Sequence, residues 1–80
     1  MGLFKKELLN VYRIEIYGMR CGMCESHVNT VIRNHFKVKK VTSSHSKNET
    51  LIYSKEELDI EEIKEVLKPT GYEIKEIKKI

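Results

Sequence analysis

The sequence predicts an α+β fold in which one four-stranded antiparallel sheet carries two helices on a single face. Short β-branched and aromatic runs alternate with segments whose apolar residues recur at helical spacing, in the order strand, helix, strand, strand, helix, strand. The chain has 80 residues, the size of one small domain. Hydrophobic residues make up 40% and charged residues 34%, a balance typical of a globular protein rather than a disordered one.

The first part of the chain predicts a strand, a loop and a helix. Apolar residues between Val11 and Tyr17 form a β-branched and aromatic run that closes at Gly18. A helix is expected from Cys24 to about His35. Its apolar positions fall at helical spacing and predict one buried face: Val28, Val31, Ile32 and Phe36.

The next part predicts a hairpin. Val38 and Val41 indicate one strand, and the segment 51–53 indicates another. The residues between these strands favour turns and predict the connection: Ser43, Ser44, Ser46 and Asn48.

The last part predicts a second helix and a final strand. Asp59 is followed three residues later by Glu62, as in a capping box, and the helical stripe after it stops at Pro69 and Gly71. Three apolar residues then resume an extended pattern: Tyr72, Ile74 and Ile77. The whole order is the ferredoxin-like βαββαβ arrangement.

We expect residues 1–80 to form a single domain, with residues 1–10 as a loosely ordered N-terminal extension. No apolar run approaches the roughly 20 residues that span a bilayer, and the first ten residues are broken by Lys5, Lys6 and Glu7. We therefore expect a cytoplasmic protein without direct membrane insertion. The net charge of +3 is a weak bias, and the stacking aromatics of an RNA-binding sheet are missing, so no nucleic-acid partner is expected.

Cys21 and Cys24 carry the predicted chemistry. In reducing cytosol, two cysteines separated by two residues indicate a ligand pair or a redox pair before they indicate a structural disulfide. They lie where a strand ends and a helix begins, and free amide groups and the helix dipole there favour thiolate over thiol. Two soft thiolates suit copper(I), Cu(I). Gly22 is expected to let the loop bend so that both sulfurs face one point.

Other candidate ligands near the cysteines are fewer than a closed zinc site requires. Zinc normally takes four ligands, and the histidines His35 and His45 are distant in sequence and expected to face solvent. His27 follows Cys24 by three residues, so it is either a third ligand or second-shell group or a surface histidine. Met23 is either a thioether that assists copper or a packing residue.

The stretch Gly18-Met19-x-Cys21-x-x-Cys24, followed by Val28, Val31 and Ile32, resembles the heavy-metal-associated domain. Copper chaperones, the N-terminal modules of copper-transporting P-type ATPases and a mercury-binding periplasmic protein share that domain. The resemblance covers residues 11–77 and includes Gly71-Tyr72. It implies that Cys21 and Cys24 bind the metal and that Met19 supports the loop from inside. For Tyr72 it implies either a shield over the sulfurs or a core aromatic that opens the last strand.

The predicted function is binding of Cu(I) and its passage to a partner by thiolate exchange, as a metallochaperone or a metal-binding module in copper homeostasis. Arg20 beside the first cysteine favours a monovalent ion. The expected partner is a metal donor or acceptor, such as a copper-transporting P-type ATPase. We expect a monomer without metal and allow a metal-bridged dimer.

Three alternatives remain open at this point. The same cysteines could serve thiol–disulfide exchange, although the expectation is that the protein is not an enzyme. The ion could be Hg(II), Zn(II) or Cd(II). The sheet could also act only as a docking module without metal.

Overall fold

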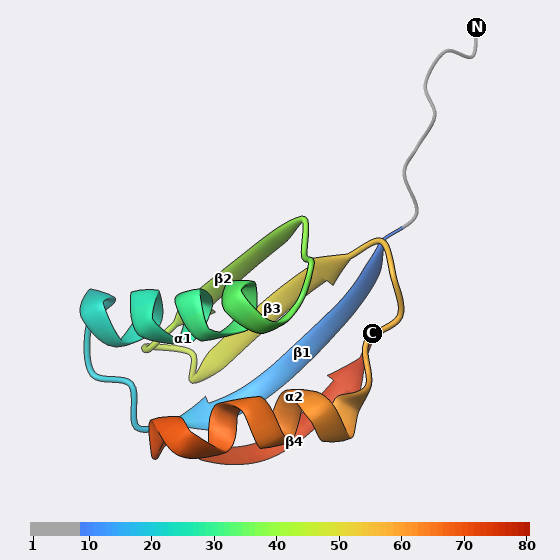
Figure 1. Ribbon diagram of the computed structural model, residues 1–80. Coiled ribbons are helices and arrows are strands. Elements are labelled where there is room, and N and C mark those ends of the chain that lie inside the picture. The colour runs from blue at the N-terminus through green and yellow to red at the C-terminus, as the bar shows by residue number, and fades with distance from the viewer. Residues whose placement is uncertain (1–8) are drawn as a thin grey trace, which may run out of the picture.

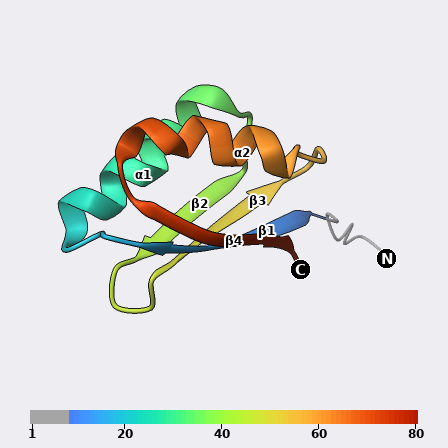
Figure 2. The same ribbon diagram turned by 90° about the horizontal axis from the view of Figure 1, so that it is seen from below.

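The computed structural model describes residues 9–80 and shows a four-stranded antiparallel sheet with two helices on one face (Figure 1, Figure 2). The predicted fold class and element order are confirmed. The strands are β1 (Asn10–Tyr17), β2 (Lys40–Ser44), β3 (Glu49–Ser54) and β4 (Glu73–Lys79). The helices are α1 (Gly22–His35) and α2 (Ile60–Leu67), and a short 3₁₀ helix, η1 (Lys68–Thr70), follows α2.

Strand β1 lies inside the sheet and determines which side chains face the helices. The strand order is β2-β3-β1-β4, so β1 pairs with β3 on one side and with β4 on the other. Ile14 stands opposite both Thr50 and Ile77. Residues that pair directly point to the same face of a sheet. The apolar residues of all four strands are therefore gathered beneath the helices.

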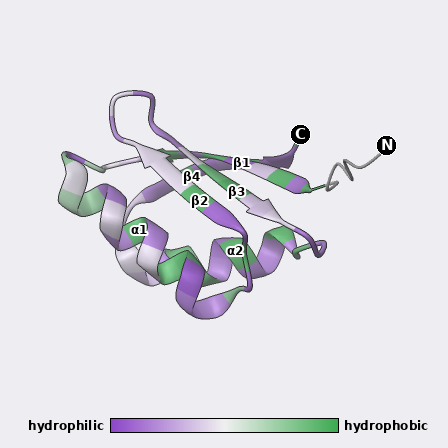
Figure 3. Ribbon diagram, turned by 90° about the horizontal axis from the view of Figure 1, so that it is seen from above, coloured by the Kyte–Doolittle hydropathy of each residue, from purple (hydrophilic) through white to green (hydrophobic). Residues whose placement is uncertain are grey.

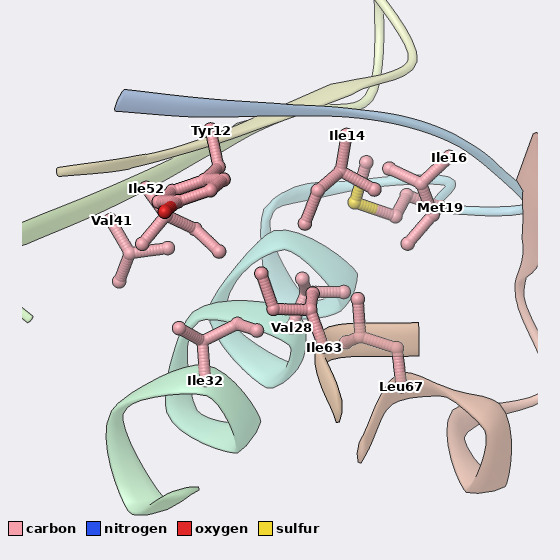
Figure 4. Packing of buried hydrophobic residues seen from close by; sticks show 10 residues of the cluster. All are labelled: Tyr12, Ile14, Ile16, Met19, Val28, Ile32, Val41, Ile52, Ile63 and Leu67. Carbon is pink, nitrogen blue, oxygen red and sulfur yellow. The ribbon is translucent and has the colours of Figure 1, made fainter. Parts of the chain in front are cut away.

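The core forms between this face and the two helices (Figure 4). Its buried hydrophobic residues are Tyr12, Ile14, Ile16, Met19, Val28, Ile32, Val41, Ile52, Ile63 and Leu67. The hydroxyl of Tyr12 is satisfied inside this core because it accepts a hydrogen bond of 2.9 Å from the backbone N–H of Leu58. The β2–β3 turn, by contrast, is hydrophilic (Figure 3).

The hairpin differs from the prediction at its serines. Ser43 and Ser44 belong to β2, and the turn occupies residues 45–48. The hydroxyl of Ser43 donates to Asn29 Oδ1 at 2.7 Å and lies 2.8 Å from the hydroxyl of Thr50. These contacts with α1 and β3 satisfy a side chain that turn propensity alone placed in the loop.

The starts of β1 and α2 can be compared with the predicted boundaries. Asn10, which we expected in the N-terminal extension, is the first residue of β1, and residues 1–8 of that extension lie outside the described residues. Asp59 caps α2 as predicted: its side chain accepts a hydrogen bond of 3.0 Å from the N–H of Glu61. Neither helix described between residues 9 and 80 is long and apolar enough to cross a membrane.

Candidate metal centre

The loop between β1 and α1 turns at Gly18. Its φ angle is +114°, a conformation that side chains rarely adopt, and a Cβ atom there would lie only 3.0 Å from Cδ1 of Tyr72. Gly22, which we expected to allow the bend, is instead the first residue of α1 and does not have a positive φ. The expected role of Gly22 therefore passes to Gly18, which provides both the turn and the space for an aromatic ring.

Met19 fixes this loop to the core. Only 6% of its surface is exposed, and its side chain lies beside Ile14 and Ile16 (Figure 4). A thioether packed among branched side chains holds the loop from inside. This is the position that the predicted support role requires.

The two cysteines occupy the start of α1. Cys21 is the N-cap residue, with extended backbone, and its carbonyl accepts hydrogen bonds from the N–H groups of Cys24 (3.1 Å) and Glu25 (3.2 Å). No side chain caps the helix at this end. Cys21 is exposed and Cys24 is partly buried, and both are free thiols. Cys21 is therefore accessible to an incoming ligand, and both cysteines lie at the positive end of the helix dipole.

Tyr72, just before β4, acts on the thiol of Cys24. The pKa of Cys24 is lowered, chiefly because the Tyr72 hydroxyl hydrogen-bonds to its sulfur and also because of backbone hydrogen bonds from Arg20; partial burial acts in the opposite direction. The same bond raises the pKa of Tyr72. A hydrogen bond to the thiolate stabilises the form that binds metal.

Met23 lies between the two cysteines in the sequence, and His27 follows Cys24 by three residues on α1. The His27 ring meets the Tyr72 ring edge-on, with centroids 6.2 Å apart and an interplanar angle of 70°. Met23 is 80% exposed. Within residues 9–80, no three His, Cys, Asp or Glu side chains come together in a group that could hold a metal ion.

The β2–β3 turn contacts the start of α1 through a pair of residues that the sequence did not connect. His45 is exposed, as expected, and its Nδ1 atom and its backbone N each lie 2.7 Å from Oε2 of Glu25, the residue after Cys24. These contacts lower the pKa of Glu25, with the backbone hydrogen bond as the largest cause. The β2–β3 turn is thereby joined to the first turn of α1. The 20-residue separation left no local signal.

Solved structures of metal-binding domains share this fold. The yeast copper transporter domain Ccc2a is 27% identical, covering 81% of this chain and 90% of its own, with a TM-score of 0.69. The CopZ metallochaperone is 20% identical, with coverage of 80% and 97% and a TM-score of 0.70. The N-terminal domain of ZntA in its Zn(II) form is 21% identical, with coverage of 82% and 89% and a TM-score of 0.70.

These similarities confirm the resemblance predicted from the cysteine motif at the level of the fold. No protein-family model matches the chain, and no curated protein matches it by sequence. The similar structures include a domain solved with Cu(I) and another solved with Zn(II). The fold does not by itself determine what this chain binds.

Proposed function

We propose that this chain is a heavy-metal-associated domain that binds Cu(I) between the thiolates of Cys21 and Cys24 and passes it to a partner protein. The observation that carries the proposal is the pair of free cysteines at the uncapped start of α1, one of them exposed and the other partly buried. The similarity to copper-handling domains supports the same function.

Copper(I) is the preferred ion for a site of this composition. Thiolates select Cu(I) among the physiological metals, whereas zinc normally takes four protein ligands in a structural site. Exposed Arg20 places a positive charge beside Cys21, and Coulomb repulsion penalises a divalent ion more than a monovalent one. Zn(II), Cd(II) and Hg(II) are the competitors that an experiment must include.

Transfer proceeds by ligand exchange. Cys21 is exposed, so a thiolate of the partner can approach the ion while Cys24 still holds it. The incoming sulfur makes the ion three-coordinate, and the bond to Cys21 then breaks before the bond to Cys24. The ion leaves with the partner and both cysteines remain as free thiolates, so only metal–sulfur bonds form and break. The protein acts as a carrier and not as an enzyme.

The proposed partner is a metal donor or acceptor with exposed thiolates, such as a copper-transporting P-type ATPase. Solved structures of this fold include a copper-binding domain from HMA7, a P-type ATPase. A cytoplasmic location is part of the proposal, because free thiols persist in a reducing compartment. A copper-bridged pair of chains is a second form that the site allows when copper is present at less than one equivalent.

A competition titration tests this function. Reduced protein is titrated with Cu(I) against a chelator of known affinity, with Zn(II) in parallel and a double variant, Cys21→Ser with Cys24→Ser, as control. We expect tight 1:1 copper binding, weaker zinc binding and loss of both in the variant. Weak copper binding by a folded protein would reject the proposal. A Cys21/Cys24 dithiol that reduces disulfides of other proteins, and is itself oxidised to a disulfide, would then favour the thiol–disulfide alternative.

A further inference from the structure

Tyr72 needs an anchor on α1 to stay over the cysteines. Its side chain is only partly buried, and its backbone N–H donates to Thr70 Oγ1 at 3.3 Å. Gly18 supplies room for the ring on one side, where a Cβ atom would come within 3.0 Å. Space alone does not select one rotamer, because a half-exposed tyrosine keeps alternatives in solvent. A contact from the helix is required to hold the ring against Cys24.

His27 makes that contact. It lies three residues after Cys24, so the two side chains occupy the same face of α1. The imidazole meets the Tyr72 ring edge-on at a centroid distance of 6.2 Å and an angle of 70°, a geometry in which aromatic rings attract each other. The ring of Tyr72 therefore lies against His27 of α1 and close to Gly18 of the metal-binding loop, and its hydroxyl lowers the pKa of Cys24.

We infer that His27 is a positioning residue that holds Tyr72 over Cys24 and thereby slows the escape of the bound ion. This inference rests on the proposed function, because it concerns how the same site retains its cargo. Without the imidazole, the tyrosine ring leaves Cys24 for part of the time. An incoming ligand then reaches the ion from the side that the ring otherwise covers, and exchange becomes faster.

His27 is also accessible from a groove that lies outside the metal-binding loop. His27 also lines a groove of about 370 Å³ between the helices, together with Val31 of α1, Val66 of α2 and Pro69 of η1. His35 lies on the same groove two turns further along α1, where its Nδ1 atom is 3.0 Å from the carbonyl of Val31. His35 therefore offers a matched histidine on the same helix face.

Three variants test the inference: His27→Ala, His27→Phe and His35→Ala. In metal-free protein, NMR would measure cross-relaxation between the Tyr72 ring protons and the β-protons of Cys24. We expect this signal to weaken in H27A and to persist in H27F, which keeps an aromatic edge, and in H35A. The thermal midpoint should change little, because His27 is exposed. An unchanged ring signal in H27A would overturn the inference.

The release rate of Cu(I) to a chelator gives the functional readout. The loss of an edge-to-face aromatic contact corresponds to roughly a two- to tenfold change in an equilibrium, so H27A should release copper faster by about that factor. H27F and H35A should stay near the wild-type rate. Equal acceleration in H35A would show that the effect belongs to the groove or to helix stability, and would reject a specific role for His27.

A double-mutant cycle with Tyr72→Ala separates action through the tyrosine from direct action on the ion. If His27 acts through Tyr72, then H27A should add nothing to the release rate in the Y72A background. The full effect in that background would overturn the inference and indicate a direct ligand role. Failure of the wild-type chain to bind copper would refute the proposed function alone, because the metal-free NMR comparison would still report on His27 and Tyr72.

Discussion

The two helices begin in different ways, although each follows a strand of the same sheet. At the start of α2, the carboxylate of Asp59 accepts a hydrogen bond from the N–H of Glu61. At the start of α1, Cys21 occupies the N-cap position and no side chain makes the corresponding bond. One helix start is capped for stability, and the other is left uncapped where the sulfurs lie.

This difference shows how the chain separates stability from function. An N-cap side chain stabilises a helix by about 1 kcal/mol. Helix α2 has this stabilisation, and α1 lacks it. In exchange, the partial positive charge of the first turn of α1 acts on Cys21 and Cys24 instead of on a capping carboxylate. Locally suboptimal choices of this kind are expected at functional sites.

The largest expected effect concerns the cysteines themselves. Replacing both Cys21 and Cys24 with serine should abolish Cu(I) binding, because a hydroxyl does not substitute for a thiolate toward a soft ion. The free energy of unfolding should change little, since Cys21 is exposed and Cys24 only partly buried. Chelator competition and urea denaturation measure the two quantities. Copper retained at wild-type affinity would place the metal elsewhere in the molecule.

The next effect concerns the turn that leads into α1. Gly18→Ala should destabilise the protein by about 1–3 kcal/mol, because its φ of +114° is unfavourable for alanine and the new methyl group would press on Tyr72. Gly22→Ala is the matched control, since a Cβ atom there meets nothing within 4 Å and alanine favours a helix. Urea denaturation compares them. Equal stabilities would show that the loop does not need Gly18.

Substitutions at the two N-cap positions test directly whether α1 lacks a cap because of its sulfurs. Cys21→Asp should stabilise the fold by about 1 kcal/mol by giving α1 a capping carboxylate, while copper binding is lost. Asp59→Ala should cost about 1 kcal/mol and leave copper binding intact. Thermal denaturation and copper titration of each variant measure both properties. A Cys21→Asp protein less stable than the wild type would refute the view that α1 gives up a cap for its sulfurs.

The smallest effect concerns the hydroxyl of Tyr72 and depends on pH. Tyr72→Phe removes the hydrogen bond that lowers the pKa of Cys24, so protons compete with copper up to a higher pH. The apparent affinity should fall by less than about tenfold. The deficit should be full at acidic pH, where Cys24 is protonated in both proteins, and should vanish at alkaline pH, where both are ionised. A deficit independent of pH would instead indicate direct contact between Tyr72 and the ion.

Much of the fold was predictable because local signals agreed with one another. Apolar periodicity located β1 and both helices, and Asp59 identified the start of α2. The serines of the hairpin misled because their turn propensity is local, whereas Ser43 is satisfied by Asn29 and Thr50, which lie on other elements. The ends of an element depend on such partners, and the sequence does not show them.

The site was predictable only in part for the same reason. The spacing of Cys21 and Cys24 and the position of Met19 could be deduced from the motif. The edge contact between His27 and Tyr72 and the pairing of Glu25 with His45 depend on how distant segments meet. Sequence separations of this size leave no periodic signal, so these contacts required the structure.

The central claim is that Cys21 and Cys24 together supply the ligands of a bound Cu(I) ion. X-ray absorption spectroscopy at the copper edge, on protein loaded with one equivalent of Cu(I), tests it most directly. The account predicts a first shell of two sulfur atoms at thiolate distance with no nitrogen, and loss of this shell in the double serine variant. A nitrogen in the shell would make His27 a ligand rather than a positioning residue, and sulfur scattering that persists in the double variant would contradict the assignment of both cysteines.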